Sequence, residues 1–357
     1  MKPAIFFTMA ALGAVLMLGG CGKIDLVPAE TARAVQIEST HGLRSWSLSG
    51  AQESRILALN PEHVTDADVR GALAGAPAPH IINIHGGIAT VIKRLESFTR
   101  FLNGLGYPEQ AMRHPGNSNH TISCYEDAEM IAGVVAWYYE REGMRPMIIG
   151  HSQGSFQAVK ALQLLAGQTA DHLTVWNPLR WRPEERTEIT DPLTGKKHPV
   201  VGLKVSYVAA LGGGGITRAL PNQWDMMFSL RSVPDAVEEF TGFHLGLDVL
   251  GGDYLGWGSS NHYHATGSAR VRNVKLPTGG FLTHGKTPDL DRMLSNPQAL
   301  AWINGYAPST NPVAPKDIPG NTEGIEFGAD VWKSVKRHWV IELQRLIRAR
   351  HGQRHGD

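Results

Sequence analysis

The chain has little cysteine and almost no excess of charge of either sign. Only two cysteines, Cys21 and Cys124, occur in 357 residues, which excludes a disulfide scaffold and a four-cysteine zinc site. The 34 Lys and Arg residues nearly balance the 33 Asp and Glu residues, for a formal charge of +1. This balance gives no electrostatic reason to expect a nucleic acid as partner. The hydrophobic fraction of 42% is large enough for a folded core, so a disordered chain is excluded as well.

One long uncharged run is present, at the N-terminus. It covers residues 4–18, after the positive charge of Lys2. This is the length of a signal-peptide core and is shorter than the roughly 20 residues of a membrane span. The run leads into Leu-Gly-Gly-Cys at 18–21, which resembles the processing box of bacterial lipoproteins. The resemblance implies cleavage after Gly20 and lipid attachment to Cys21. The alternatives are a plain secretory signal with a chance cysteine, or an uncleaved anchor.

The lipoprotein resemblance also implies a domain organisation. Residues 1–20 would be the signal peptide and residues 21–50 a lipidated tether, which leaves 51–357 as one folded domain. Gly22 rather than Asp follows the cysteine, and by resemblance to enteric lipoproteins this implies the outer membrane. We therefore expect a lipid-anchored protein of the bacterial cell envelope. Cys124 would then have no partner for an internal disulfide.

From about residue 78 the chain alternates short apolar runs with amphipathic stretches, a pattern typical of a parallel α/β sheet. The predicted strands are 80–84, 146–149, 173–176 and 226–230, and the predicted helices are 92–105, 127–142, 152–166 and 330–350. Residues 179–222 break this alternation and contain four consecutive glycines at 212–215. We interpret 179–222 as an insertion over the carboxyl edge of the sheet, which could act as a lid.

The predicted C-terminal helix has one apolar and one basic face. Asp330 is its expected N-cap. The basic face includes Lys333, Lys336 and Arg337. It favours either a helix that closes the sheet with a solvated outer face, or a contact with an anionic membrane.

A five-residue motif lies between a predicted strand and a predicted helix. Gly150-His151-Ser152-Gln153-Gly154 matches G-x-S-x-G, which places a serine at the tip of a sharp strand-to-helix turn. The N-terminus of the following helix directs backbone N–H groups at a developing oxyanion. Ser152 is therefore the predicted nucleophile. The alternative is an ordinary helix N-cap serine.

A second motif, His85-Gly86-Gly87, directly follows a predicted strand upstream. Glycines at this point free the backbone to turn an N–H inward, so Gly86, Gly87 and Gln153 are predicted to form an oxyanion hole. With both motifs in place, residues from about 78 to 350 resemble the α/β-hydrolases of the lipase and esterase type. The resemblance implies a mostly parallel central sheet flanked by helices, with an inserted lid. The fuller HGGG motif of that family is not met, because Ile88 takes the fourth place.

The same resemblance implies a triad in the chain order Ser, acid, His. Asp235 follows a predicted strand and a short turn, and is the predicted acid. Its rival Asp225 would begin that strand and lie at the wrong end of the sheet. A histidine after the acid is then needed as general base, and His262 is predicted, with His264 and His284 as alternatives.

Two patterns raise the question of metals and nucleotides. His262 and His264 have a spacing that could suit metal ligands, but no HExxH motif or Cys/His cluster accompanies them. Residues 280–287 match the P-loop pattern G-x4-G-K-T, but Pro288 follows at once and no later apolar run ends in a magnesium-binding Asp. We treat the second match as coincidence and expect no metal, cofactor or nucleotide.

These observations together predict a membrane-anchored serine hydrolase. The expected reaction is cleavage of carboxylic esters through an acyl-enzyme, with lipid or short-chain esters as substrates. One alternative is amidase, peptidase or thioesterase chemistry on the same fold. The other is a catalytically inactive module of the same fold that binds a partner.

Overall fold

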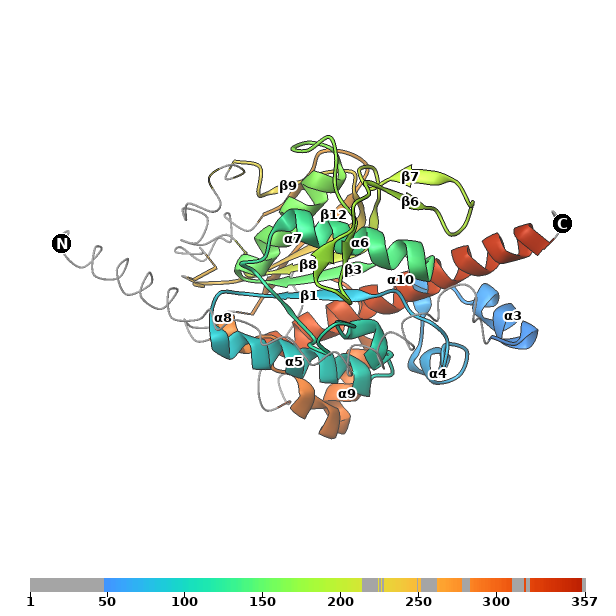
Figure 1. Cartoon of the computed structure of the whole chain (residues 1–357). Helices are drawn as coiled ribbons and strands as arrows, with labels where there is room; N and C mark the ends of the chain where they lie inside the picture. Colours follow the sequence, from blue (N-terminus) through green and yellow to red (C-terminus); the bar gives the residue numbers. More distant parts are fainter. Residues whose placement is uncertain are drawn as a thin grey trace.

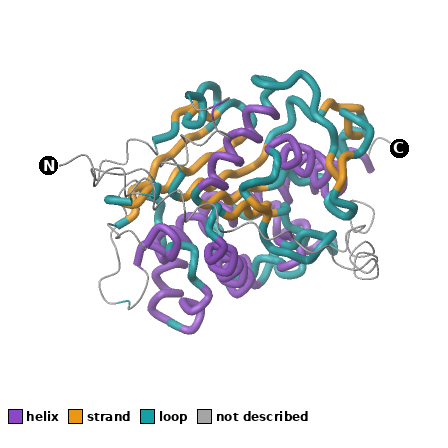
Figure 2. Tube along the Cα trace, turned by 60° about the vertical axis from the view of Figure 1, so that its left-hand side comes forward, coloured by secondary structure: helices purple, strands orange, loops and turns teal. Residues whose placement is uncertain are grey.

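The structure is a computed structural model with α/β architecture, a six-stranded parallel sheet between two layers of helices (Figures 1 and 2). The order of strands across the sheet is β12 (Arg270–Leu276), β10 (Val237–Leu245), β8 (Val205–Leu211), β3 (Met147–His151), β1 (Ile81–His85) and β2 (Ile122–Ser123). The residues that the structure describes are 48–213, 224, 226, 228–248, 250–251, 262–277, 283–309, 318 and 322–354. The predicted signal peptide, Cys21 and nearly all of the predicted tether lie outside these residues.

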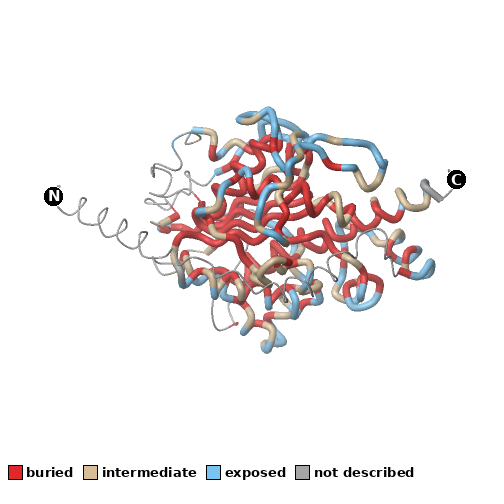
Figure 3. Tube along the Cα trace, viewed as in Figure 1, coloured by how far each residue is buried: buried red, intermediate tan, exposed pale blue. Residues whose placement is uncertain are grey.

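Helices cover both faces of the sheet. Helices α6 and α7 lie on one face, and α5 and α10 on the other (Figure 1). Figure 3 shows the strands between them as the most completely buried part of the molecule. The α-helices are α3 (Gly50–Ala58), α4 (Asp66–Arg70), α5 (Ala89–Gly104), α6 (Ala128–Glu142), α7 (Gln153–Leu165), α8 (Thr283–Lys286), α9 (Pro297–Gly305) and α10 (Thr322–Arg354). Within the described ranges, no helix combines the length and the apolar composition that crossing a bilayer requires.

The first half of the sheet follows the sequence pattern closely. Strands β1 and β3 and helices α5, α6 and α7 lie within a few residues of their predicted bounds, which confirms these predictions. Local chemistry explains the ends of α6. The Asp127 side chain accepts a hydrogen bond from the Glu129 N–H at the start, and Gly143, with φ 68°, ends the helix in the left-handed conformation.

The second half differs from the prediction. Residues 173–176 form no strand of the central sheet, although Trp176 begins the short strand β4 (Trp176–Asn177), which pairs with β5 (Arg182–Pro183) in a separate hairpin. The predicted strand at 226–230 is also wrong, because residue 226 is 3₁₀-helical and residues 228–230 form a turn. The chain instead enters the sheet through β8 and β10. A further small sheet pairs β9 (Ser232–Val233) with β11 (His264–Ala265).

The predicted insertion at 179–222 needs correction on two counts. Strand β8 falls inside it, yet β8 lies between β3 and β10 in the central sheet. The hairpin of β6 (Glu188–Thr190) and β7 (Lys197–Pro199) packs on the last turns of α6, where Arg186 pairs with Glu140. Because α6 leads into the first residue of β3, this hairpin lies toward the amino edge of the sheet and not over its carboxyl edge.

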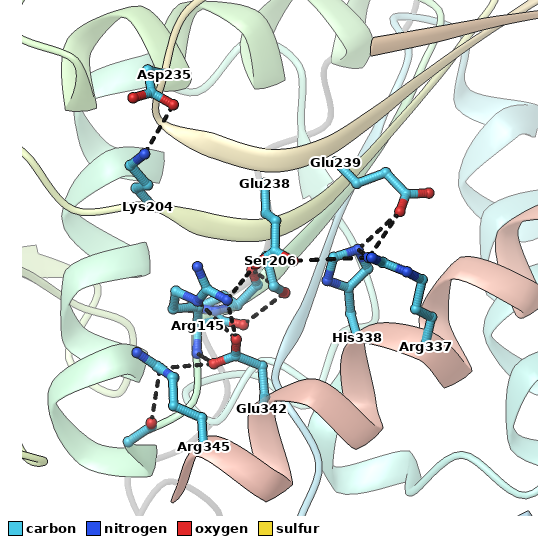
Figure 4. A network of polar contacts seen from close by, with 12 residues as sticks. Arg145, Lys204, Ser206, Asp235, Glu238, Glu239, Arg337, His338, Glu342 and Arg345 are labelled. Atoms are coloured by element: carbon cyan, nitrogen blue, oxygen red, sulfur yellow. Dashed lines mark hydrogen bonds and ion pairs between the residues drawn. The ribbon is translucent and has the colours of Figure 1, made fainter. Parts of the chain in front are cut away.

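Helix α10 starts eight residues earlier than predicted, so Asp330 is an interior residue and not the N-cap. Asp330 instead forms a buried ion pair with Arg272 of β12. Most of the basic side chains on this face interact with other residues of the same chain. The Lys333 ammonium donates to the Glu62 carbonyl at 2.6 Å, and Arg337 pairs with Glu62 and Glu239. The predicted solvated face therefore packs largely against other parts of the chain, and Figure 4 shows part of this polar network along α10.

Candidate active site

Ser152 lies at a strained turn between β3 and α7. Its backbone has φ 55° and ψ −124°, a conformation that residues other than glycine rarely adopt. The neighbouring glycines are required by close packing. A Cβ on Gly150 would lie 2.7 Å from the Gly154 carbonyl oxygen, and a Cβ on Gly154 would lie 2.2 Å from that of Ile84. Ser152 occupies the N-cap position of α7, but its side chain makes no capping hydrogen bond and its backbone lacks the extended conformation of an ordinary N-cap.

The turn is tied to the neighbouring strand β8. The Ser152 N–H donates to the Leu211 carbonyl at 2.7 Å. The Ser155 hydroxyl lies within reach of two carbonyl oxygens, of Gly150 at 3.0 Å and of Leu211 at 3.2 Å. These contacts fix the strained serine at the carboxyl edge of the sheet, where β3 and β8 end together.

The glycines after β1 lie directly against Ser152. A Cβ on Gly86 would lie 2.7 Å from Ser152 Cβ and 3.3 Å from its Oγ. A Cβ on Gly87 would lie 3.2 Å from the Gln153 side-chain oxygen. The structure therefore brings together Gly86, Gly87, Ser152 and Gln153, as the sequence predicts. Only residues without a side chain can approach the serine this closely.

The residues at the start of α7 complete this arrangement. Gln153 is its first residue and is fully buried. Its side-chain amide has no hydrogen-bond partner within the described part of the chain. The first N–H groups of a helix have no partner inside the helix, and they carry the positive end of its dipole. The backbone at Gln153 is thus suited to bind a negatively charged oxygen beside Ser152.

Asp248 and His284 form a buried pair that the sequence predictions did not identify. Asp248 lies three residues after β10, and His284 belongs to the short helix α8. The His284 Nδ1 and the Asp248 Oδ2 are 2.6 Å apart, and the two side chains are only 1% and 2% exposed. Burial alone would raise the pKa of Asp248. The charge of His284, the hydrogen bond that His284 donates and the hydrogen bond from the Gly251 N–H outweigh this effect, so the pKa of Asp248 is lowered. Asp248 is thus held as a carboxylate.

The His284 ring lies close to the end of β8, where the Leu211 carbonyl accepts the Ser152 N–H. A Cβ on Gly212 would lie 2.9 Å from His284 Cε1, and Gly212 directly follows Leu211, which accepts the Ser152 N–H. His284 Nε2 has no hydrogen-bond partner within the described residues, including Ser152 Oγ. In known enzymes without substrate, the hydrogen bond between a catalytic serine and its histidine is often long, and it tightens only when substrate binds. Ser152, Asp248 and His284 thus follow β3, β10 and β12 at one edge of the sheet.

The structure does not bring Asp235 to this edge. Asp235 precedes β10, and because β10 runs parallel to β3, it lies at the amino edge, opposite Ser152. Its exposed carboxylate pairs with Lys204 at 2.9 Å (Figure 4) and accepts a hydrogen bond from Ser268. Both contacts lower the pKa of Asp235, the Ser268 hydrogen bond first. The predicted role of Asp235 as the acid therefore has no support in the geometry. Asp225, the rival, lies outside the described residues.

Nor does the structure connect the predicted base to the serine. His262 is exposed, and its ring packs edge-on against His244 at 5.1 Å between centroids. His264 is also exposed and begins β11, with its Nε2 3.1 Å from the Ser232 hydroxyl. No hydrogen bond or ring contact in the described part of the chain joins either histidine to Ser152. Of the three candidate histidines from the sequence, His284 is the one that has a carboxylate partner.

The segment that resembles a P-loop has a different structure where it is described. Residues 283–286 form α8, a helix of a single turn, and His284 within it is bonded to Asp248. Residues 280–282 lie outside the described part. Within the described ranges, no three His, Cys, Asp or Glu side chains are grouped as a metal ion would require.

Comparisons with known proteins give no relative. No family model, no curated protein and no solved structure matches the chain. The chemistry of this site must therefore be argued from its own residues.

Proposed function

We propose that the protein is a serine hydrolase of the α/β-hydrolase class with Ser152, His284 and Asp248 as its triad. One observation carries the proposal: the buried Asp248–His284 pair lies at the same sheet edge as the strained turn that holds Ser152. The chain order of Ser, acid and His and the strands that they follow also agree with that class. His284 replaces His262 as the proposed base, and Asp248 replaces Asp235 as the proposed acid.

The roles follow from the contacts. His284 Nε2 takes the proton of the Ser152 hydroxyl as its oxygen attacks a carbonyl carbon, and returns it to the leaving group. Asp248 fixes the proton of His284 on Nδ1 and stabilises the imidazolium that forms. The N–H of Gln153 and an N–H of the Gly86–Gly87 turn bind the oxyanion, each contributing roughly 3–4 kcal/mol. Water then cleaves the acyl-enzyme by the same route.

Carboxylic esters, including lipid or short-chain esters, are the proposed substrates. Ester cleavage needs only the groups above, and the alkoxide leaving group takes its proton from His284. Turnover of a p-nitrophenyl ester should exceed that of the matching p-nitroanilide. The reverse ratio would favour amidase or peptidase chemistry in the same site.

The decisive experiment is labelling with a fluorophosphonate, which reacts with an activated serine. Wild-type protein should be labelled at one residue, and Ser152→Ala should not be labelled. Ser118→Ala is the matched control, because Ser118 is the other described serine with positive φ, at 59°. Wild-type protein that folds but takes no label would identify an inactive module and contradict the proposal.

We also retain the proposal that Cys21 carries a lipid and anchors the chain in the cell envelope. Its support is the sequence at 4–21 alone. Metabolic labelling with a fatty-acid analogue should be lost in Cys21→Ser and kept in Cys124→Ser, since Cys124 is buried in the folded domain. Labelling that survives in Cys21→Ser would contradict this proposal.

A further inference from the structure

His151 makes a hydrogen bond that links the nucleophile to the base. It is the last residue of β3, it directly precedes Ser152, and it is 1% exposed. Its Nε2 lies 2.8 Å from the backbone carbonyl oxygen of His284, which is 133 positions away in the chain. A carbonyl can only accept, so His151 Nε2 carries a proton and donates. His151 Nδ1 has no partner within the described residues.

This bond and the Asp248 contact hold different parts of the same residue. Asp248 holds the imidazole of His284 through Nδ1, whereas His151 holds its main chain. The helix that carries His284 has only four residues, so its own hydrogen bonds can do little to fix its position. The His284 carbonyl is therefore connected to Ser152 through the side chain of His151 and the peptide bond between His151 and Ser152.

The charge state of His151 suits this place. Burial is the larger cause and the charge of the nearby His284 the smaller cause that lower the pKa of His151, to about 3. It therefore stays neutral at working pH, which matters because the two imidazole rings are 4.9 Å apart. A second positive charge at this distance would oppose the imidazolium that His284 becomes during the reaction.

We propose that His151 is a positioning residue, which sets the distance between Ser152 and His284 through its hydrogen bond to the His284 carbonyl. The proposal rests on the proposed function of these two residues. The G-x-S-x-G motif leaves the residue before the serine unspecified, and in this chain His151 has a defined role at that place.

Two variants test it. His151→Phe keeps a ring but removes the donor, whereas His151→Gln places an amide N–H at about the reach of Nε2. We expect His151→Phe to lower kcat about 100-fold, as a misplacement of about 1 Å can do, with KM changed less than about twofold. The rate of fluorophosphonate labelling should fall with kcat, and His151→Gln should restore most of both.

A second measurement does not require activity. The Nδ1 proton between His284 and Asp248 should give a downfield proton resonance in NMR spectra, absent from Asp248→Asn. We expect His151→Phe to broaden or shift this resonance and His151→Gln to retain it. Wild-type protein that takes no fluorophosphonate label but shows these differences would overturn the proposed function and not the hydrogen bond.

Two outcomes would overturn the positioning role itself. One is a His151→Phe variant with unchanged kcat and an unchanged resonance. The other is an equal loss in both variants together with an equal fall in melting temperature, which would indicate a packing role only.

Discussion

The carboxylate of Asp248 and the imidazole of His284, 36 positions apart in the chain, meet at 2.6 Å with almost no exposure to solvent. Taking a carboxylate out of water is costly unless hydrogen bonds compensate for the lost hydration. Asp248 receives two, from His284 and from the Gly251 N–H at 2.9 Å. The pair is therefore held rigidly, and its position relative to Ser152 leads to specific expectations for substitutions.

Replacing the acid tests which aspartate serves the triad. Asp248→Asn keeps the shape of the side chain but offers an amide to His284, so the imidazole loses its orienting carboxylate. We expect kcat to fall by roughly 10³–10⁴-fold. Asp235→Asn is the matched control and should keep kcat within about twofold, because Asp235 lies exposed at the other edge. A large loss in Asp235→Asn with normal Asp248→Asn would restore the sequence-based assignment.

Replacing the histidines separates the candidates for general base. His284→Ala should lower kcat by more than about 10³-fold, because among the described residues no other histidine is hydrogen-bonded to Asp248. His262→Ala and His264→Ala should leave kcat nearly unchanged, since both rings are exposed and face other partners. Steady-state kinetics on one ester with all three variants makes the comparison. Activity retained in His284→Ala would exclude it as the base.

Ser152 should show an opposition between stability and activity. Its φ of 55° costs about 1–3 kcal/mol for a residue with a side chain, and glycine adopts this conformation without strain. We expect Ser152→Gly to melt about 2 °C above Ser152→Ala, and we expect both variants to be inactive. Calorimetry of the two proteins tests this. Equal melting temperatures would mean that the turn stores no strain.

The glycine turn after β1 should tolerate no side chain. In Gly86→Ala the new Cβ would lie 2.7 Å from Ser152 Cβ, so the turn must move away and its N–H is displaced from the oxyanion. A loss of about 10²–10³-fold in kcat is expected, with a smaller change in KM. Gly305→Ala, where a Cβ meets nothing within 4 Å, serves as the control. If both variants were equally active, the turn would have no part in catalysis.

The buried end of α6 should make stability depend on pH. Burial raises the pKa of Glu142 to about 8 and lowers that of His80, 3.6 Å away, to about 3. Between pH 4.5 and 8 the folded state therefore holds a proton on Glu142 that the unfolded chain releases, whereas between pH 3 and 6.5 the unfolded chain holds a proton on His80 that the folded state lacks. The two effects oppose each other below pH 6.5, and from there to pH 8 stability falls as pH rises. Glu142→Gln removes this loss, so at pH 9 it should be more stable than wild type by about 2 kcal/mol, after discounting for partial exposure.

Urea unfolding at pH 5 and pH 9 measures the difference. The control is Glu188→Gln, whose side chain is half exposed and which should change stability by less than about 0.5 kcal/mol at either pH. A Glu142→Gln protein with the same pH dependence as wild type would show that Glu142 ionises normally.

The sequence predicts the first half of the site because its signals are local. Turns rich in glycine, a strand before each motif and a helix after the serine are patterns within about fifteen residues. They locate Ser152, Gly86, Gly87 and Gln153, which the structure brings together. The positive φ of Ser152 belongs to the sharp turn that the same motif predicts.

The sequence does not locate the acid in this way because its pattern does not reveal strands β8 and β10. The apolar run of β8 precedes a glycine run, a combination that favours an insertion over a central strand. Strand β10 has two glutamates near its start, and such charges argue against a buried strand. Glu239 is accommodated by Ser334 and Arg337 of α10, about 95 positions later. Without β8 and β10, the sequence pattern places the acid before β10, at Asp235, whereas the structure places a carboxylate after β10, at Asp248.

The contacts of α10 with helix α3 fix the place at which the preceding chain enters the domain. Gln344 donates to backbone carbonyls of Ile56 and Leu59, and His351 pairs with Glu53. These contacts hold α3 at the end of the molecule away from α8, as Figure 1 shows. A pull exerted through the chain that precedes Leu48 therefore acts on the side opposite Ser152. If the proposed lipid on Cys21 attaches the chain to a membrane, the edge that carries Ser152 is the one farther from that attachment and faces molecules that arrive from outside it.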